Sequence, residues 1–261
     1  MKIVYFKICN EKKVTDMGWK EEFLNKMFVE KDIENGLHLY VEHQPETIFR
    51  YRYGSQNDIN ALKYDQIWLS NMKCLNDKFE GQLEISYDNM NFNFESLEDM
   101  LKTKVDAMIE QVISSFYIAC FCESVLKDTM WSYYANNHKG FCIEYYFNSF
   151  ESPQFIFPVV YKDSKKIDIN NLNESEMYKS ILTKYSDWSK EDEWRIALPY
   201  YDEKTDGKVI KQPLPKAIYM GVDIEIQLKN FLMQHCEERF IELYQMELDT
   251  RKRRLIPKQI L

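Results

Sequence analysis

The acidic segment at residues 191–195, Glu-Asp-Glu-Trp-Arg, runs directly into the apolar residues 196–198. This junction constrains the fold, because two carboxylates and a guanidinium must be placed beside a hydrophobic core. If the charged residues open a strand, alternation puts Glu191, Glu193 and Arg195 on one side of it. Such charges are kept either as a structural ion-pair cluster or because a reaction needs them.

The rest of the chain mixes helical and strand patterns irregularly. Apolar patterning predicts strands at 1–8, 47–53, 66–70, 116–122, 141–147, 155–161, 194–200, 217–220 and 243–248, with a short strand or turn at 37–41 and a final strand near 251–256. Helices are expected at 19–28, 55–62, 96–112, 128–137, 174–185 and 225–239. Because many strands are adjacent and strict βαβ order is missing, we expect one α+β domain over 1–261, with a mixed or mostly antiparallel central sheet flanked by helices.

Charge and composition limit the classes of function. The net charge is −8 and the pI is near 5.2, so a broadly basic nucleic-acid surface is not expected. No run approaches the ~18 apolar residues of a membrane span, and the amino terminus lacks a signal-peptide pattern. The six cysteines are scattered without Cys-x-x-Cys spacing, which favours reduced thiols and a cytoplasmic protein. With four scattered histidines, a His-rich metal site is not expected.

Two arginines lie on one face of the strand at 47–53. Arg50 and Arg52 alternate with aromatic residues, among them Tyr51. Arginine suits bidentate phosphate recognition, and a flanking tyrosine can stack on a ring. The structural alternative is an edge strand with a solvated charged face and a buried aromatic face.

Two further segments carry candidate side chains. In the turn at 75–81, Asp77 and Glu80 could ligate a hard cation or simply stabilise a tight loop. In the helix expected at 128–137, helical spacing aligns Trp131, Tyr134 and His138 on one stripe. Such a stripe is often core, and His138 could cap the helix or act as a base.

The order of these segments resembles the bacterial DUF2971 family. The resemblance rests on Ile-Phe-Arg-Tyr-Arg (48–52), Ile-Trp-Leu-Ser (67–70), Leu-Asn-Asp-Lys-Phe-Glu-Gly (75–81), Ala-Cys-Phe-Cys-Glu-Ser (119–124), Met-Trp-Ser-Tyr-Tyr-Ala (130–135), His-Lys-Gly-Phe-Cys-Ile-Glu (138–144), Tyr-Ser-Asp-Trp (185–188) and Glu-Asp-Glu-Trp-Arg (191–195). Lys78 stands where the family usually has proline. The family-like core covers about 47–200, and the extensions 1–45 and 201–261 are expected to pack on it.

A second resemblance is to ADP-ribosyltransferases, whose pattern is an early arginine, a middle serine and a late Glu-x-Glu. It implies a split sheet and NAD as substrate, with Glu193 catalytic and Glu191 orienting the acceptor. A carboxylate beside the developing oxocarbenium ion stabilises the transition state more than the ground state. The implied NAD-binding candidates are Arg50, Tyr51, Arg52, Ser70, Trp131, Tyr134 and His138.

Three functions stay open at this point. The first is an NAD-dependent ADP-ribosyltransferase, toxin-like or active in phage defence, which modifies a protein or nucleic acid and has a neutralising partner protein. The second is a non-catalytic sensor or binding module in which Arg52 and Glu193 belong to a structural network. The third is a metal-dependent nuclease that uses Asp77, Glu80, Glu123 and Glu191.

Overall fold

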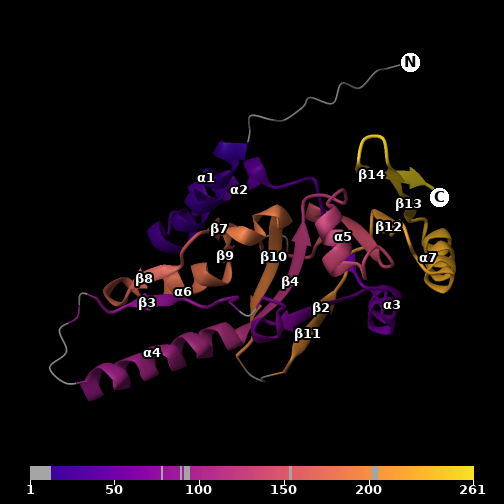
Figure 1. Cartoon of the computed structure of the whole chain (residues 1–261). Coiled ribbons are helices and arrows are strands. Elements are labelled where there is room, and N and C mark those ends of the chain that lie inside the picture. Colours follow the sequence, from indigo (N-terminus) through magenta and orange to yellow (C-terminus); the bar gives the residue numbers. More distant parts are fainter. Residues whose placement is uncertain (1–12, 78, 89, 91–94, 153–154, 202–204) are drawn as a thin grey trace.

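A ten-stranded sheet organises the part of the chain that the computed structural model describes, residues 13–77, 79–88, 90, 95–152, 155–201 and 205–261 (Figure 1). Its main path is β11 (Gly207–Lys211), β2 (Gln66–Asn71), β4 (Phe116–Cys122), β1 (Thr47–Arg52), β5 (Phe141–Tyr146), β12 (Ala217–Met220), β13 (Glu242–Asp249) and β14 (Arg254–Gln259). The strand β10 (Glu193–Pro199) pairs with β4 along its length, and also with β6 (Ile156–Pro158). In this sheet β12 and β13 run parallel and the other pairs are antiparallel, which confirms the α+β prediction.

The sheet forks at β4. On the side away from β10, one end of β4 pairs with β2 through Tyr117 and Ile118, and the other end pairs with β1 through Cys122. Both β1 and β2 therefore meet the same strand and diverge from each other beside the residues at 119–121. One branch continues to β11 and the other to β14. The fork divides the sheet, and it leaves a gap between the two branches.

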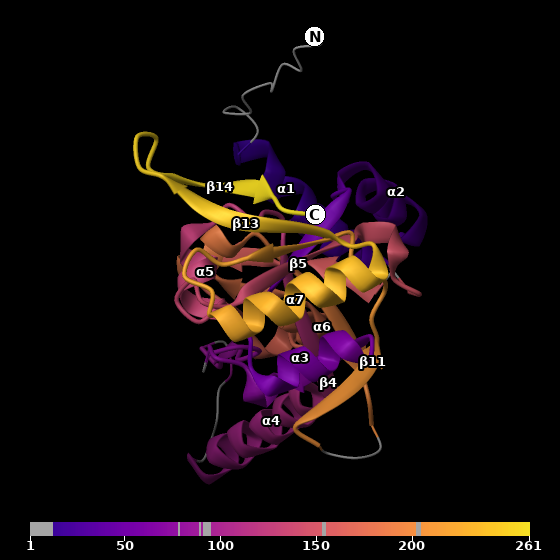
Figure 2. The same ribbon diagram turned by 90° about the vertical axis from the view of Figure 1, so that its right-hand side faces the viewer.

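Helices and small sheets surround this framework (Figures 1 and 2). The helices are α1 (Lys13–Leu24), α2 (Ile33–His43), α3 (Gln56–Lys63), α4 (Glu95–Ser115), α5 (Asp128–Tyr134), α6 (Glu174–Ile181) and α7 (Ile226–Arg239). Two parallel pairs of short strands lie outside the main sheet, β3 (Glu84–Ser86) with β8 (Lys166–Asp168), and β7 (Val160–Lys162) with β9 (Thr183–Tyr185). Within the described residues no helix has both the length and the apolar character that a membrane crossing needs.

Strand alternation separates two hydrophobic cores. Ile48 and Trp194 belong to the core that α1, α2 and α7 help to build. Phe49 and Tyr51 belong to a second core, which contains Trp131 of α5. Because successive side chains of a strand point to opposite faces, the strand residues at 193 and 195 lie on the face opposite Trp194.

Most predicted elements are confirmed, including the helix that Ser55 caps through a reciprocal bond with Asp58. Strands β3, β8 and β11 were not predicted, and the predicted strand at 1–8 lies outside the described residues. The segment 37–41 is wrong as a strand, because it lies in α2, whose amino end Asp32 caps. Tyr40 of that helix is buried and donates to the Ile156 carbonyl at 2.7 Å, so tertiary packing outweighs local propensity.

Two predicted helices are too long. Helix α5 ends at Tyr134, and the three residues at 136–138 all have left-handed φ angles of 50–66°. The chain must turn early because Gly140 packs directly on the backbone at the end of β1. Helix α6 ends at Ile181, after which Thr183–Tyr185 forms β9.

The packing of Gly140 gives a stability prediction. A Cβ at this position would clash with the Arg52 carbonyl oxygen and lie 2.9 Å from the Tyr53 carbonyl oxygen, so Gly140→Ala should cost at least about 1–3 kcal/mol. Gly18 lies in α1 with nothing within 4 Å of its Cβ position, so Gly18→Ala is the matched control and should stabilise slightly. Thermal unfolding measures both, and equal melting temperatures for the two variants would refute the close packing of Gly140.

Candidate functional site

A cavity of about 200 Å³ lies at the fork of the sheet. Its walls come from β1, β2, β4, β10 and α5, together with Lys184 of β9 and part of the loop that ends near Glu80. Seven of the candidates that the ADP-ribosyltransferase resemblance implies line it: Arg50, Tyr51, Arg52, Ser70, Tyr134, Glu191 and Glu193. Asp77 and Glu80 line it as well, so the structure brings together segments that are far apart in the chain.

The guanidinium of Arg195 is the centre of the polar wall, and it is fully buried. It donates to both oxygens of Glu193, from Nε at 2.6 Å and from the second terminal nitrogen at 3.1 Å. Its other terminal nitrogen donates to Glu80 at 2.9 Å and to the Ile181 carbonyl at 2.6 Å. A buried guanidinium needs such pairing, because desolvation of an unpaired charge costs several kcal/mol.

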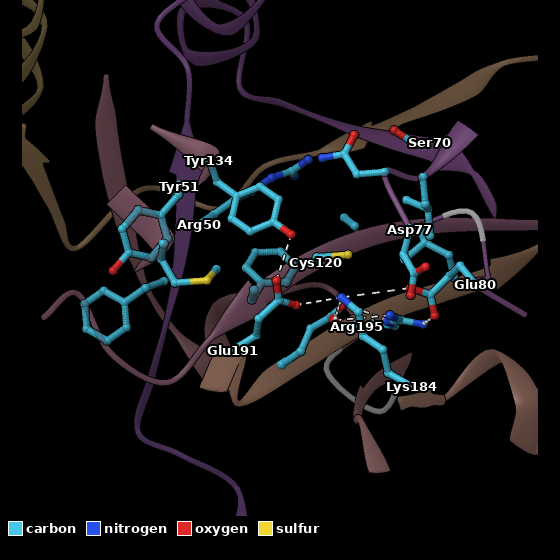
Figure 3. Close-up of a pocket in the computed structure, with 18 of the residues that line it drawn as sticks. Arg50, Tyr51, Ser70, Asp77, Glu80, Cys120, Tyr134, Lys184, Glu191 and Arg195 are labelled. Carbon is cyan, nitrogen blue, oxygen red and sulfur yellow. Dashed lines mark hydrogen bonds and ion pairs between the residues drawn. The ribbon is translucent and has the colours of Figure 1, made fainter. Parts of the chain in front are cut away.

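Lys184 bonds both carboxylates of the Glu-x-Glu motif, and Figure 3 shows it beside Glu191. Its Nζ donates to Glu191 at 2.6 Å and to Glu193 at 3.2 Å, and it lies 4.5 Å from the ring centre of Trp188. Burial alone would lower the pKa of Lys184, but the charges of Glu193 and Glu191 outweigh it and raise that pKa. The ammonium group therefore stays protonated at neutral pH.

Helix α5 holds Glu191 from the opposite side. The hydroxyl of Tyr134 donates to Glu191 at 2.7 Å (Figure 3). Lys127, just before the helix, pairs with Asp192 at 2.6 Å and donates to the Lys190 carbonyl at 2.7 Å. Because Asp192 has a left-handed φ of 43°, β10 begins only at Glu193, yet Glu191 and Glu193 still face the same cavity.

The two carboxylates differ in the hydrogen bonds that they can still accept. An ionised carboxylate has about four lone-pair sites. Glu193 accepts two bonds from Arg195 and one from Lys184, and it also bonds the thiol of Cys120. Glu191 accepts from Tyr134 and Lys184 alone among the described residues. Glu193 is therefore saturated, and Glu191 keeps capacity for a ligand.

Their pKa values move in opposite directions. Burial and the charge of Glu193 raise the pKa of Glu191, against the opposing charge of Lys184. Burial would also raise the pKa of Glu193, but Arg195 and Lys184 outweigh it and hold that pKa at about 2. Carboxylates that are separated in this way can take different roles in one reaction.

The two arginines of β1 also differ. Arg52 pairs with Asp58, which caps α3. Arg50 donates to the Trp68 carbonyl at 2.7 Å across the fork and packs over the ring of Phe121. It makes no ion pair within the described residues, and burial lowers its pKa to about 10, with a further contribution from Arg52. Arg50 is therefore the guanidinium available to an anionic ligand group.

Trp131 and His138 do not line this cavity. Trp131 is fully buried in the second core, where its indole donates to the Val125 carbonyl at 2.7 Å. The ring of His138 stacks on Trp131 and lies 3.4 Å from a carboxylate oxygen of Asp128. The predicted helical stripe ends because α5 ends at Tyr134, the one residue of the three that faces the cavity.

Sequence reasoning missed Lys184 and Cys120 as cavity residues. Lys184 was expected inside a helix, and no local motif marks it. Cys120 faces the cavity from β4 and keeps exposed surface there, while desolvation of the thiolate and the charge of Glu193 raise the pKa of its thiol. Alternation along β4 places it opposite Arg195 in the register, which could have been found only after the two strands were paired.

The four carboxylates of the nuclease hypothesis, those of Asp77, Glu80, Glu123 and Glu191, do not meet at one site. Glu123 accepts from the Trp194 indole at 2.7 Å and from Lys20 at 3.4 Å, and it does not line the cavity. Glu80 is held by Arg195. Among the described residues, no three His, Cys, Asp or Glu side chains form a group that could hold a metal ion.

The opposite pKa directions predict opposite effects of two matched substitutions. The depressed pKa of Glu193 contributes stability that is present above its ordinary value of 4.5 and is lost as pH falls toward about 2. Glu193→Gln should therefore cost about 3 kcal/mol at pH 7 and much less near pH 2. The raised pKa of Glu191 means that its ionised form destabilises the fold at pH 7, so Glu191→Gln should be neutral or stabilising. Denaturant unfolding at both pH values measures this, and an equal loss in the two variants at pH 7 would contradict it.

The comparisons with known proteins give one match. Searches of curated proteins and of solved structures found none. The family model of DUF2971, described as a protein of unknown function, matches residues 130–196, a segment that contains Tyr134, Lys184, Glu191, Glu193 and Arg195. The match supports the resemblance to the DUF2971 family that the motifs predicted.

Proposed function

We propose that the protein transfers ADP-ribose from NAD to a macromolecular acceptor. One observation carries the proposal: Arg50, Ser70 and Glu191 line a single cavity although they come from three distant segments. These residues follow the order of the ADP-ribosyltransferase pattern, which has an early arginine, a middle serine and a late Glu-x-Glu motif. An anion-binding guanidinium and a carboxylate with free acceptor capacity are the two groups that this chemistry needs.

The cavity size suggests which part of NAD it takes. Cavities that enclose whole drug-sized ligands measure roughly 300–1,000 Å³, and this one measures about 200 Å³. It therefore suits one end of a dinucleotide. The nicotinamide ribose would enter beside Tyr134 and Glu191, and Arg50 would bind a phosphate oxygen.

The proposed step is cleavage of the bond between the ribose carbon and the nicotinamide nitrogen. The bonding electrons leave with nicotinamide, and positive charge develops on the ribose. The Glu191 carboxylate stabilises this charge, and its raised pKa suits it to take the proton of the acceptor as the new bond forms. This assignment reverses the order that the motif suggested, because Glu193 is saturated by Arg195, Lys184 and Cys120. Glu193 acts here as a positioning residue.

A non-catalytic binding module is the second candidate. It is favoured by the pairing of Arg195 and Lys184 with Glu80 and Glu193, which forms a buried network whatever the cavity binds. The expected Arg52–Glu193 network is not formed, because Arg52 pairs with Asp58 instead. In this function the same cavity would bind a ligand without turnover.

The test is release of nicotinamide from NAD that carries the label in its nicotinamide ring, with cell extract as the source of acceptors. Glu191→Gln should lower the rate by roughly 100-fold or more. Asp192→Asn is the matched control, since Asp192 is the adjacent carboxylate, is half-exposed, and does not line the cavity. Asparagine tolerates its left-handed backbone, so this variant should keep the wild-type rate.

Two results would contradict the proposed enzymatic function. Release that is unchanged in Glu191→Gln removes the catalytic role, and ligand binding without any release favours the binding module. A second label in the adenylate half of NAD identifies the acceptor as protein or nucleic acid. The same reaction repeated with co-purified proteins tests for a neutralising partner, which a toxin-like or phage-defence enzyme would need.

A further inference from the structure

Asp77 has a buried oxygen that the proposed reaction does not use. It lies in the loop after the short 3₁₀ turn Met72–Cys74 and lines the cavity. Its Oδ1 accepts from the Phe79 amide at 2.9 Å, which fixes the carboxylate. Its Oδ2 is buried and has no hydrogen-bond partner among the described residues.

An acceptor in this state is costly. Leaving a buried acceptor unsatisfied destabilises the folded protein, and more so when the group is charged. The other buried side-chain atoms without a partner in the described parts of the chain belong to Tyr87, Tyr145, Gln212 and His235. None of these residues lines the cavity. Asp77 therefore combines an unsatisfied acceptor with a place in the cavity wall.

The neighbouring charges indicate what kind of donor would fit. Lys165 is buried, its charge interacts with both Asp77 and Arg195, and burial lowers its pKa. Its Nζ donates to the Phe79 carbonyl at 3.1 Å. Arg195 is already paired with Glu80 and Glu193, and the charge of Lys165 interacts with Glu80 and Asp77, so the cations near Asp77 are matched by carboxylates. A neutral hydroxyl donor fits this end because it brings no further charge.

The position of Asp77 separates it from the reacting end. Figure 3 shows Asp77 and Glu80 at one end of the cavity, and Tyr134 and Glu191 toward the other. Glu80 is committed to Arg195, so Asp77 is the carboxylate of this end with a free acceptor atom. A riboside that spans the cavity would meet Glu191 at its reacting carbon and Asp77 at a hydroxyl of the same ribose.

We propose that Asp77 is a specificity-determining residue whose Oδ2 accepts a hydrogen bond from a ribose hydroxyl of the ligand. The choice of ribose as the ligand group rests on the proposed function. The unsatisfied Oδ2 acceptor is a feature of the structure and does not depend on that function. The subsite would select a hydroxylated sugar over its deoxy form, because a deoxy ligand leaves the buried Oδ2 unsatisfied.

The test uses Asp77→Asn, which can keep the bond to the Phe79 amide and replaces Oδ2 with a donor. The probes are nicotinamide riboside and its 2′-deoxy and 3′-deoxy forms, with binding measured by calorimetry in the Glu191→Gln background so that no probe is consumed. In the Glu191→Gln protein with Asp77 intact, one deoxy form should bind roughly tenfold to hundredfold more weakly than the riboside. With Asp77→Asn, the riboside should weaken by the same factor and the preference over that deoxy form should vanish. Asp192→Asn in the same background should change neither.

Equal affinity of the riboside with and without Asp77→Asn would overturn the subsite, and so would undetectable binding to both. A large fall in melting temperature of Asp77→Asn would also overturn it, since Asp77 would then be a structural residue. Nicotinamide release from NAD separates the two claims. Release that depends on Glu191, together with no effect of Asp77→Asn, rejects the subsite and leaves the enzyme. Selective riboside binding without release rejects the enzyme and leaves the subsite.

Discussion

The buried pair of Arg195 with Glu193 is the interaction on which the site depends. Both side chains are almost fully buried, so each requires the other to offset its desolvation. Arg195 also holds Glu80, which lies 115 residues earlier in the chain, and Glu193 holds Lys184. The pair thereby fixes the loop near Glu80, strand β9 and strand β10 around one cavity. Because it consumes the acceptor sites of Glu193, it also leaves Glu191 as the carboxylate that can meet a ligand.

The fork in the sheet explains why a cavity forms at this point. Strands β1 and β2 both pair with β4, and they diverge beside the residues at 119–121. Backbone groups along such a divergence need other partners. Arg50 supplies one of them by donating to the Trp68 carbonyl across the gap. The same guanidinium lines the cavity without an ion pair among the described residues, so it is the group that we propose binds an anionic ligand.

Sequence patterns predicted the strands that build the cavity and the shared orientation of Glu191, Glu193 and Arg195. The orientation held although the strand starts at Glu193, because the left-handed Asp192 still turns Glu191 into the cavity. The role of Lys184 could not be predicted, because its position depends on β9 packing beside β10 and not on a local motif. The length of α5 could not be predicted from the local sequence pattern either, because the contact of Gly140 with β1 ends the helix early. His138 consequently lies away from the cavity, whereas Trp131 does so because its side chain packs in the second core.

The two carboxylates of the Glu-x-Glu motif line one cavity, yet the pKa of Glu191 is raised and the pKa of Glu193 is lowered. The most direct test of this difference is a carbon-13 NMR titration of glutamate carboxyl groups, assigned with Glu191→Gln and Glu193→Gln. The account predicts a pKa of about 2 for Glu193 and a pKa above the ordinary 4.5 for Glu191. Two carboxyl signals that titrate together near 4.5 would contradict it.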